Sequence, residues 1–513
     1  MISSAKFRLR QRPILYFLLV SVLVVVAVVV ISCGGTSSFT PTPGMGTINL
    51  SISDPPSCMA STSGTAAPAP VGGTASPAGT FMHVYVTIRS IQAHTSATAD
   101  NSSSGWQELA PQLVSAPAQV DLLHLPASGN GVQCLLEQLG STSLPAGDYQ
   151  QIRLILLANV ATTGPVPASN ACASLGNFFN CVVNSTGTHA LDLTSEATTG
   201  LRIPPGQIMG GPIHVAAGQS VDLNIDFDTC NSIHKEGNGN FVLKPALTGG
   251  VVSANKTGIS GQIVDSITSQ PVAGAIVTLQ FADNSGTDRV AMQQVTDSTG
   301  NFGFCPLPSG AMFDVVTDAL TASGTAYNAT VVLNVPGGTN LGAVPLVAET
   351  PATAGASTGP GTIQGTITAI NGTTGASIDV DVSALQSVTV SGTIHTFTVP
   401  LFANSIAAGI TVNSSTSCPT GAPTGSFCGS YTLIVPASNP TIGTFSAGKT
   451  TITPPATGDV LYTVEADATN PTSGAAMCSP SSQTTSKDST AMPLKVTAGA
   501  TTTAAELDFK SCS

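Results

Sequence analysis

The chain has 513 residues, so three or four domains are expected rather than a single core. Charged residues make up 8% of the sequence and aromatic residues 5%, whereas 52 glycines and 35 prolines are present. With 42% hydrophobic residues, this composition excludes a disordered chain and is typical of exported β-rich modules joined by turns.

The charge balance argues against nucleic acid as a partner. The formal net charge is −12, and the only charges in residues 1–32 are Lys6, Arg8, Arg10 and Arg12. Removal of this segment would leave 11 of the 15 basic residues against 27 acidic ones, a net charge near −16. Such a surface repels a phosphate backbone, and no basic stripe offsets it.

The basic N-terminus leads into a long apolar run, residues 13–32, that ends next to a cysteine. About 20 apolar residues are enough to span a bilayer, and a basic segment followed by an apolar core is also the outline of a secretory signal. At the end of the run, Val30, Ile31, Ser32 and Cys33 resemble the lipobox of bacterial lipoproteins. A retained transmembrane helix that happens to end at this cysteine is the alternative.

The lipobox resemblance implies a signal peptide over residues 1–32 and a lipidated tether over residues 33–46. In that family the cysteine thiol receives a diacylglyceryl group, a peptidase cuts before the cysteine, and the new N-terminus is acylated. Each buried methylene adds about 0.8 kcal/mol, so several chains give a stable membrane anchor. The residue after Cys33 is Gly34 rather than the aspartate of the inner-membrane retention signal, which implies the outer membrane with its face left open.

The ten other cysteines predict disulfides, because an even count in an exported chain is typical of them. No C-x-x-C occurs, which argues against zinc and thioredoxin-type sites. The disulfide candidates are Cys58, Cys134, Cys172, Cys181, Cys230, Cys305, Cys418, Cys428, Cys478 and Cys512. The favoured pairs are Cys172 with Cys181, Cys418 with Cys428, Cys478 with Cys512, and Cys58 with Cys134. Cys230 and Cys305 remain by elimination as a candidate bridge between two domains, and the sequence alone leaves the connectivity open.

Residues 47–255 form a first β-rich unit. Its strands show alternation of apolar and polar residues, as in TINLSISDPP, FMHVYVTIRSIQAH and VDLNIDFD. In order, the blocks VDLL, LPAGDYQQIRL, IPPGQI, VAAGQSVDLNIDFD and FVLKPAL resemble domain of unknown function 4382 of bacterial lipoproteins over most of residues 47–252. The resemblance implies an exported β-rich domain and no reaction.

Residues 256–348 form a second unit. The pattern GISGQIVDSITSQPVAGAIVTLQ followed by VTDSTGNFGFCPLPSG resembles the carboxypeptidase regulatory-like β-sandwich. Gly300 and Gly310 supply turn conformations that other residues resist. We expect Asp297 to cap the turn and Phe302 to enter the core.

The remainder of the chain is a linker and a third unit. Residues 349–361 are rich in Pro, Ala, Gly and Thr and predict the linker. Residues 362–513 contain short Thr/Val/Ser strands and predict a C-terminal β-sandwich-like domain. Residues 363–370 echo residues 259–266 at a spacing of 104, a weak internal repeat.

Few residues suggest chemistry. Asp222, Asp226 and Asp228 point to one face of a strand and are weak candidates for Ca²⁺, but a solvated strand face predicts the same pattern and is favoured. No metal or cofactor is therefore expected. The match of Gly355, Ser357 and Gly359 to a hydrolase G-x-S-x-G lies in the linker, without the strand and helix that this motif needs.

Seven histidines show no metal-ligand spacing, and each is expected on a surface or a strand face. They are His83, His94, His124, His189, His214, His234 and His395. The single tryptophan, Trp106, follows a Ser/Gly loop and is a candidate for stacking on a sugar. A core-edge position with Leu109 behind it is favoured for Trp106.

The sequence predicts a non-enzymatic cell-envelope lipoprotein made of tandem β-sandwich-like domains. A binding or adhesion module for carbohydrate is the first expected function, since the regulatory-like sandwich belongs to a carbohydrate-binding-like class. The alternative is a structural spacer or an assembly partner of envelope proteins. Exposed aromatic side chains would favour the first function, and polar faces with paired edge strands would favour the second.

Overall fold

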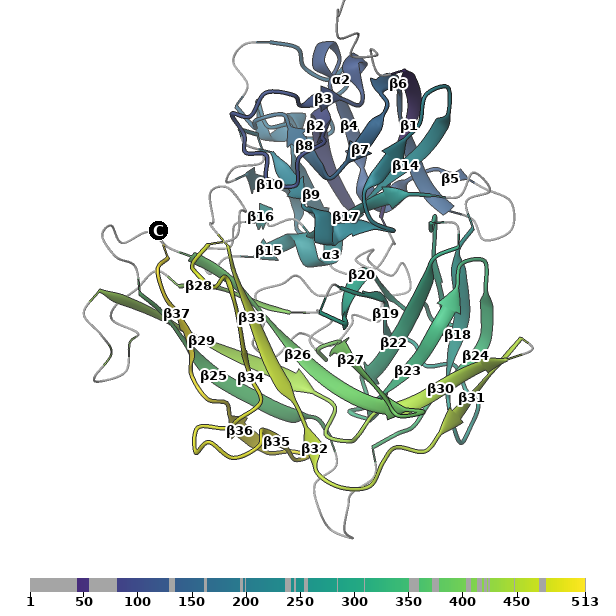
Figure 1. Ribbon diagram of the computed structural model, residues 1–513, viewed down its shortest axis with the longest axis vertical. Helices are drawn as coiled ribbons and strands as arrows, with labels where there is room; N and C mark the ends of the chain where they lie inside the picture. Colours follow the sequence, from purple (N-terminus) through teal and green to yellow (C-terminus); the bar gives the residue numbers. More distant parts are fainter. Residues whose placement is uncertain are drawn as a thin grey trace, which may run out of the picture. The chain divides into compact units, whose positions relative to one another are not determined.

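The chain is described by a computed structural model that is nearly all β-strand, which confirms the all-β expectation (Figure 1). The described residues are 44–54, 81–128, 134–160, 164–193, 197–198, 200–235, 241–243, 246–252, 257–283, 285–308, 310–349, 359–370, 378–402, 407–412, 418, 422, 425–446, 448–469 and 477–512. Among these residues the helices are short: α2 (Pro111–Ser115), α3 (Thr229–Ser232), η1 (Leu122–His124), η2 (Ala173–Leu175) and η3 (Pro205–Gln207). A search of the described residues finds no helix with the length and apolar character needed to cross a membrane.

Two sheets build the first unit. One has six strands in the order β12 (Ile208–Met209), β17 (Ala246–Val251), β14 (Ser220–Asp228), β1 (Met45–Ser53), β6 (Cys134–Pro145) and β5 (Ala127–Ser128). The other follows the order β11 (Leu201–Ile203), β8 (Gln151–Leu156), β2 (His83–His94), β9 (Cys181–Asn184), β10 (Gly187–Leu193), β16 (Phe241–Leu243) and β15 (Ile233–Lys235), with β3 (Gln107–Glu108) and β4 (Ala118–Asp121) also paired to β2. A separate pair joins β7 (Gly147–Tyr149) to β13 (Ile213–Val215).

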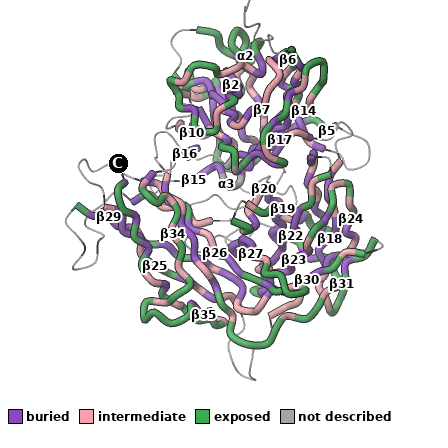
Figure 2. The backbone as a smooth tube through the Cα atoms, in the orientation of Figure 1, coloured by how far each residue is buried: buried purple, intermediate pink, exposed green. Residues whose placement is uncertain are grey.

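The first core lies between these two sheets, and the predicted alternation fills it. Strands β1 and β14 are parallel neighbours, with Leu50 opposite Leu223 and Ile52 opposite Ile225. All four side chains are fully buried, as is Val84 of β2 in the same core. Figure 2 colours the buried stretches of the backbone purple. Since side chains alternate across a strand, one hydrophobic face per sheet is enough to specify this packing.

The second unit packs a three-stranded sheet against part of a larger one. The small sheet has the order β21 (Asn301–Phe304), β18 (Ile259–Asp265) and β24 (Asn340–Leu346). The strands opposite are β20 (Thr287–Val295), β19 (Ile276–Ala282), β22 (Met312–Leu320) and β23 (Ala326–Pro336). Their shared core contains Ile263, Leu279 and the predicted Phe302.

The turn before β21 forms as the sequence predicts. Asp297 Oδ1 accepts hydrogen bonds from the backbone N–H groups of Thr299 at 2.8 Å and Asn301 at 2.9 Å. Gly300 between them has a φ of +75°, and a Cβ there would come within 2.5 Å of the Ile263 carbonyl oxygen. The aspartate and the glycine therefore fix the conformation that directs Phe302 into the core.

Strands of the second and third units form one sheet of 11 strands. From the third unit it contains β26 (Ile378–Val390), β27 (Thr393–Val399), β28 (Ala408–Val412), β30 (Thr441–Ser446), β31 (Lys449–Thr453), β33 (Thr463–Thr469) and β34 (Ser482–Thr485). The two units join twice through parallel pairs, β20 with β27 and β23 with β30. The predicted linker, residues 349–361, thus connects units that share a hydrogen-bonded sheet.

The third unit completes its core with side chains of the second. Its other sheets contain β29 (Ser426–Val435), β25 (Gly361–Ile370), β36 (Thr501–Thr503) and β37 (Leu507–Phe509), and the pair β32 (Val460–Leu461) with β35 (Lys495–Val496). Val316, Ala329 and Val331 of the second unit are buried in the same cluster as Phe397 and Val464 of the third. Separation of the two units would therefore expose apolar surface on both.

The weak repeat corresponds to two strands with the same surroundings. Strand β18 is central in its sheet, antiparallel to β21 and parallel to β24. Strand β25 is likewise central, antiparallel to β29 and parallel to β36 and β37. The echo between residues 259–266 and 363–370 therefore reflects equivalent positions within the two units.

Candidate functional site

The predicted lipidation site, Cys33, lies outside the described residues, as do the apolar run before it and Ser357 of the G-x-S-x-G match. Cys58 also lies outside them, and the side chain of Cys230 is not described. The structure therefore bears on the remaining disulfides, the acidic strand, the tryptophan and the histidines.

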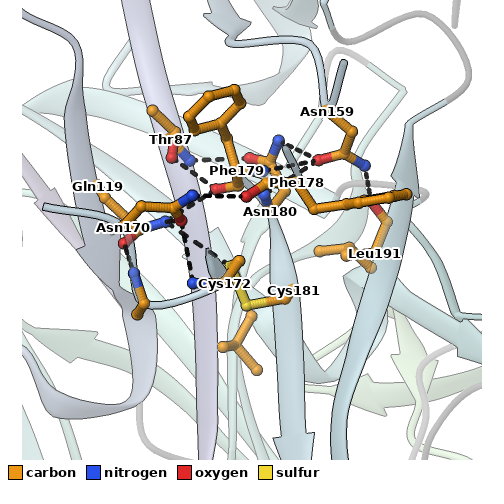
Figure 3. Close-up of a disulfide and its surroundings, with 12 residues drawn as sticks. Thr87, Gln119, Asn159, Asn170, Cys172, Phe178, Phe179, Asn180, Cys181 and Leu191 are labelled. Atoms are coloured by element: carbon orange, nitrogen blue, oxygen red, sulfur yellow. Dashed lines mark hydrogen bonds between the residues drawn. A yellow bond between two sulfur atoms is a disulfide. The ribbon is translucent and has the colours of Figure 1, made fainter. Parts of the chain in front are cut away.

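Three predicted disulfides are present. Cys172 pairs with Cys181, Cys418 with Cys428, and Cys478 with Cys512. The first is held in a network of buried amides (Figure 3). The Asn180 side chain accepts from the Thr87 N–H at 2.8 Å and donates to Asn159 Oδ1 at 2.9 Å. These hydrogen bonds satisfy the buried Asn180 amide, which would otherwise destabilise the fold. The role of the network is therefore structural.

The expected pair of Cys58 with Cys134 and the candidate pair of Cys230 with Cys305 are both wrong. Cys134, in β6 of the first unit, is bonded to Cys305, directly after β21 of the second. The Cα atoms are 5.1 Å apart, although 171 residues separate the two in sequence. Nearby, the Thr248 hydroxyl of β17 donates to the Ala291 carbonyl of β20 at 2.9 Å. The first and second units are therefore linked covalently and by a buried hydrogen bond.

The acidic face of β14 is not the solvated face that the sequence favoured. Asp226 is 1% exposed and Asp228 is 7% exposed. Thr248 lies opposite Asp226 on the neighbouring strand and contacts β20, so the second unit covers this face. Asp222 accepts from the Asn49 amide at 2.7 Å, and Asp226 accepts from the Ser53 hydroxyl at 2.7 Å. These side chains form a polar ladder between two parallel strands rather than a common ion site.

Buried carboxyls next to this ladder have raised pKa values. Burial is the main cause for both Asp54 and Asp226, and their Oδ2 atoms have no hydrogen-bond partner among the described residues. The charge of Asp228 adds to the effect at both positions. A protonated carboxyl lowers the cost of such burial, so the folded state favours the protonated form of Asp54 and Asp226 more than water does.

Trp106 occupies the core-edge position that was favoured. The Arg153 guanidinium lies 4.2 Å from the centroid of its ring, and His94 meets the ring at an edge, 5.1 Å between centroids. Its indole N–H donates to the Asp100 carbonyl at 3.0 Å. Arg153 therefore occupies one face of the ring, which a sugar would need for stacking, and Trp106 is half-buried. Among the described residues, no Phe, Tyr or Trp side chain is exposed.

Charged and amide side chains join the second and third units. Arg289 of β20 binds Glu465 of β33 through both terminal nitrogens, with one contact at 2.9 Å, and its Nε donates to Asp283 at 2.8 Å. Gln280 of β19 accepts from the Thr398 N–H of β27 at 3.0 Å and donates to its carbonyl oxygen at 2.6 Å. These side chains therefore satisfy one another's polar groups across the boundary.

A second buried group lies at this joint. Asp318 of β22 is fully buried, and neither of its carboxyl oxygens has a partner among the described residues. Burial and the neighbouring Glu349 raise the pKa of Asp318, and burial raises the pKa of Glu349 to about 7. Glu349 accepts from the Ala437 N–H at 2.6 Å, which ties the end of the second unit to the third.

The unfolding free energy is expected to fall as pH rises from 5 to 8. The folded state keeps a proton on Glu349 up to about pH 7, whereas an unfolded glutamate loses it near its ordinary value. At a pH below the pKa of the unfolded glutamate, both states are protonated and the free energy of unfolding does not depend on this group. The free energy of unfolding falls as the pH rises above that pKa, and the fall is complete above the pKa of the folded state, at up to about 3 kcal/mol. Asp318, Asp54 and Asp226 act with the same sign.

Denaturant titrations at pH 5, 6, 7 and 8 measure this dependence. Glu349→Gln should reduce the slope, because its amide oxygen can still accept from Ala437 while the titrating group is gone. Asp283, whose pKa is lowered to about 2, acts only at lower pH. A stability that rises between pH 5 and 8 would contradict the assignment.

One side-chain cluster was missed by sequence reasoning. His83 and His124 both place Nδ1 next to Asp121 Oδ2, at 2.6 and 3.0 Å. In the part of the chain that the structure describes, these three residues are the one group of His, Cys, Asp or Glu side chains close enough to share an ion. The only sequence signal was Asp121-x-x-His124, since His83 comes from another strand.

Comparisons with known proteins give one family match and several distant structural alignments. No curated protein matches the chain. Alignments with solved structures include the TIE protein of Bacillus anthracis, at 10% identity and a TM-score of 0.15, covering 91% of this chain and 51% of that protein. The chain thus spans about half the length of the TIE protein.

Two pilins align over 60% of the chain. They are the shaft pilin SpaA of Lactobacillus rhamnosus GG, at 11% identity and a TM-score of 0.17 over 100% of that protein, and the minor pilin GBS52 of Streptococcus agalactiae, at 14% identity and 0.15 over 98%. At these TM-scores the likenesses carry no argument. The family comparison is specific: residues 45–245 match the model described as domain of unknown function DUF4382, over the region where the sequence blocks resembled it.

Proposed function

We propose that this chain is a non-enzymatic cell-envelope lipoprotein whose residues from 45 onward act as a continuous structural spacer. The observation that carries the proposal is the connection between units. A disulfide joins the first unit to the second, and one sheet runs from the second into the third. A chain that holds its units together in this way transmits position and force from a membrane anchor to whatever its distal surface contacts.

The burial of aromatic side chains supports a spacer over carbohydrate recognition. Sugar-binding surfaces present aromatic rings for stacking, yet the described Phe, Tyr and Trp side chains are buried or half-buried. The exposed large hydrophobic residues, such as Ile267 and Ile394, are single aliphatic side chains. The regulatory-like resemblance of residues 256–348 is compatible with either function, because function resides in a site rather than in a fold.

The acidic residues support a structural role as well. Asp100, Asp283, Asp297 and Asp488 each accept hydrogen bonds from the residue two positions later, in turns of the form Asp-x-Ser/Thr. These bonds lower the pKa of all four carboxyls, although burial partly opposes them. Four of the 27 acidic residues therefore stabilise turns.

The anchor is tested by substitution of Cys33. In a bacterium that processes lipoproteins, Cys33→Ser should abolish incorporation of labelled fatty acid, because the thiol is the acyl acceptor. It should also prevent cleavage before residue 33, so the product keeps its signal and runs at a higher mass. Fatty-acid labelling and gel mobility measure both effects.

Ser32→Ala is the matched control, because it keeps a small residue before the thiol and should keep the label. Two results together would refute the lipid anchor: Cys33→Ser leaves the gel mobility and the membrane fraction unchanged, and the wild-type chain takes up no labelled fatty acid. A retained transmembrane helix would then hold the protein in the membrane. The spacer itself is tested separately by cutting the chain between its second and third units.

A further inference from the structure

We propose that His83, Asp121 and His124 bind a divalent transition-metal ion of the Zn²⁺ class. The proposal is independent of the spacer function. Each residue offers one ligand atom, and these atoms all lie within 4.8 Å of one another. Local sequence spacing offers only Asp121-x-x-His124, and the pairing of β2 with β4 brings His83 to these two residues.

The fold brings the three side chains together by two simple devices. Asp121 ends β4 and lies opposite Tyr85 of β2, so its side chain shares a face with His83, two residues earlier on β2. His124 ends the 3₁₀ turn η1 that follows at once. Since a 3₁₀ helix has three residues per turn, positions three apart lie one above the other, which places His124 next to Asp121.

Buried neighbours fix the turn that carries two of the ligands. Leu122 and Leu123, between Asp121 and His124, are each 1% exposed and belong to the first core. The Val84 N–H donates to Asp121 Oδ1 at 3.3 Å, which leaves Oδ2 directed at the two imidazoles. The ring of His83 is stacked on Tyr85, with the ring planes 13° apart. The ligand set is therefore held by the scaffold of the sheet.

The distances suit a metal ion after a small adjustment. The two Nδ1 atoms lie 2.6 and 3.0 Å from the same oxygen, and the two imidazole centroids are 4.6 Å apart. Zinc binds histidine nitrogen and carboxylate oxygen at about 2.0–2.2 Å, so ligand atoms around it stand about 3.3 Å apart in a tetrahedron. An opening of about 0.3–0.7 Å between the Asp121 oxygen and the two imidazole nitrogens would admit an ion among the three ligand atoms.

The donor set and the exposure select the class of ion. Two imidazole nitrogens and one carboxylate oxygen suit Zn²⁺, Ni²⁺ or Cu²⁺, whereas Ca²⁺ and Mg²⁺ prefer oxygen ligands alone. The side chains of His83 and His124 are 39% and 45% exposed, and that of Asp121 is 16% exposed. The site thus opens to solvent on the histidine side, which leaves a coordination position for water or for a group from another molecule.

His214 provides a matched control within the same unit. Its Nδ1 lies 2.6 Å from Asp148 Oδ1, as close as His83 is to Asp121, but both side chains are exposed. No third ligand from the described residues is close enough to complete a site. A histidine–aspartate pair alone should bind metal weakly. The comparison separates a three-ligand site from any nonspecific affinity of histidines for metal.

Titration calorimetry with ZnCl₂ on the purified, tag-free mature protein in detergent tests the proposal. We expect one ion per chain with a micromolar Kd. His124→Gln should weaken binding at least 30-fold and Asp121→Asn at least 10-fold, while His214→Gln leaves the Kd within twofold. Co²⁺ should give the visible absorption bands of a four-coordinate site in the wild type and lose them in His124→Gln.

Several results would overturn the site. Titration of the wild-type protein with Zn²⁺ is decisive without any variant. If 100 µM Zn²⁺ gives no detectable binding, the proposal is refuted. Binding that survives in both His124→Gln and Asp121→Asn places the ion elsewhere, as does equal loss in His214→Gln. Circular dichroism of each variant confirms that the strands remain, and His124→Gln, at a half-exposed position, is chosen because it removes no core contact.

Discussion

Replacement of both Cys134 and Cys305 by serine is expected to lower the free energy of unfolding by about 5 kcal/mol, the largest single effect in the molecule. The disulfide spans 171 residues, and in the chain-entropy account the restriction that a crosslink places on the unfolded chain grows with the length of the closed loop. The folded state loses the one disulfide that joins the first and second units in the part of the chain that the structure describes. Denaturant unfolding of the double variant under oxidising conditions measures the loss.

The control is the double serine variant of Cys418 and Cys428, which closes a loop of only 10 residues within the third unit. The same account predicts a cost of about 3 kcal/mol for that pair. The order of the two effects is the decisive result. If the short-loop variant is as destabilised as Cys134/Cys305, the long disulfide does not restrain the relative freedom of the units, and its proposed role is wrong.

Arg289→Met should destabilise the chain by about 3–5 kcal/mol, because it leaves carboxylates at the joint without their cation. Glu465 is 5% exposed, and Arg289 binds it through both terminal nitrogens while also binding Asp283. These partners raise the pKa of Arg289 against the opposing effect of burial. Methionine keeps much of the aliphatic packing, so the loss reports on charge pairing. Denaturant unfolding measures it.

Two comparisons isolate this pairing. The double variant Arg289→Met with Glu465→Gln should recover part of the loss, since no buried charge is then left unpaired. Lys495→Met removes an ion pair to Asp459 that is more than half exposed on both sides, and an exposed pair contributes at most about 1 kcal/mol. Equal effects of Arg289→Met and Lys495→Met would show that the joint contributes no more than an ordinary surface pair.

The sequence predicted the features that depend on local pattern. Alternation identified the inward faces of β1 and β14, and the Asp297–Gly300 turn formed with the roles expected of both residues. The disulfides of short span were found because their loops bring the two cysteines together whatever the tertiary structure. Each of these features is decided by residues close in sequence.

Features that depend on distant strands were not predictable in the same way. From the sequence, the polar face of β14 is predicted to be solvated. In the structure β20 packs over this face, and Asp226 is buried. Cys134 meets Cys305 only because two separate units pack together. The cluster of Asp121 with both histidines needs the pairing of β2 with β4, which no spacing in the sequence encodes. Burial and long-range register decide these sites.

The central claim is that the second and third units form one body, and a cut between them tests it most directly. Residues 351–357 would be replaced by the recognition sequence of a site-specific protease, and the cleaved protein passed over a size-exclusion column. Every described disulfide lies wholly on one side of this cut. The shared sheet, the common core and the Arg289–Glu465 pair predict that both fragments elute together as a single species. Two separate peaks under native conditions would contradict the account.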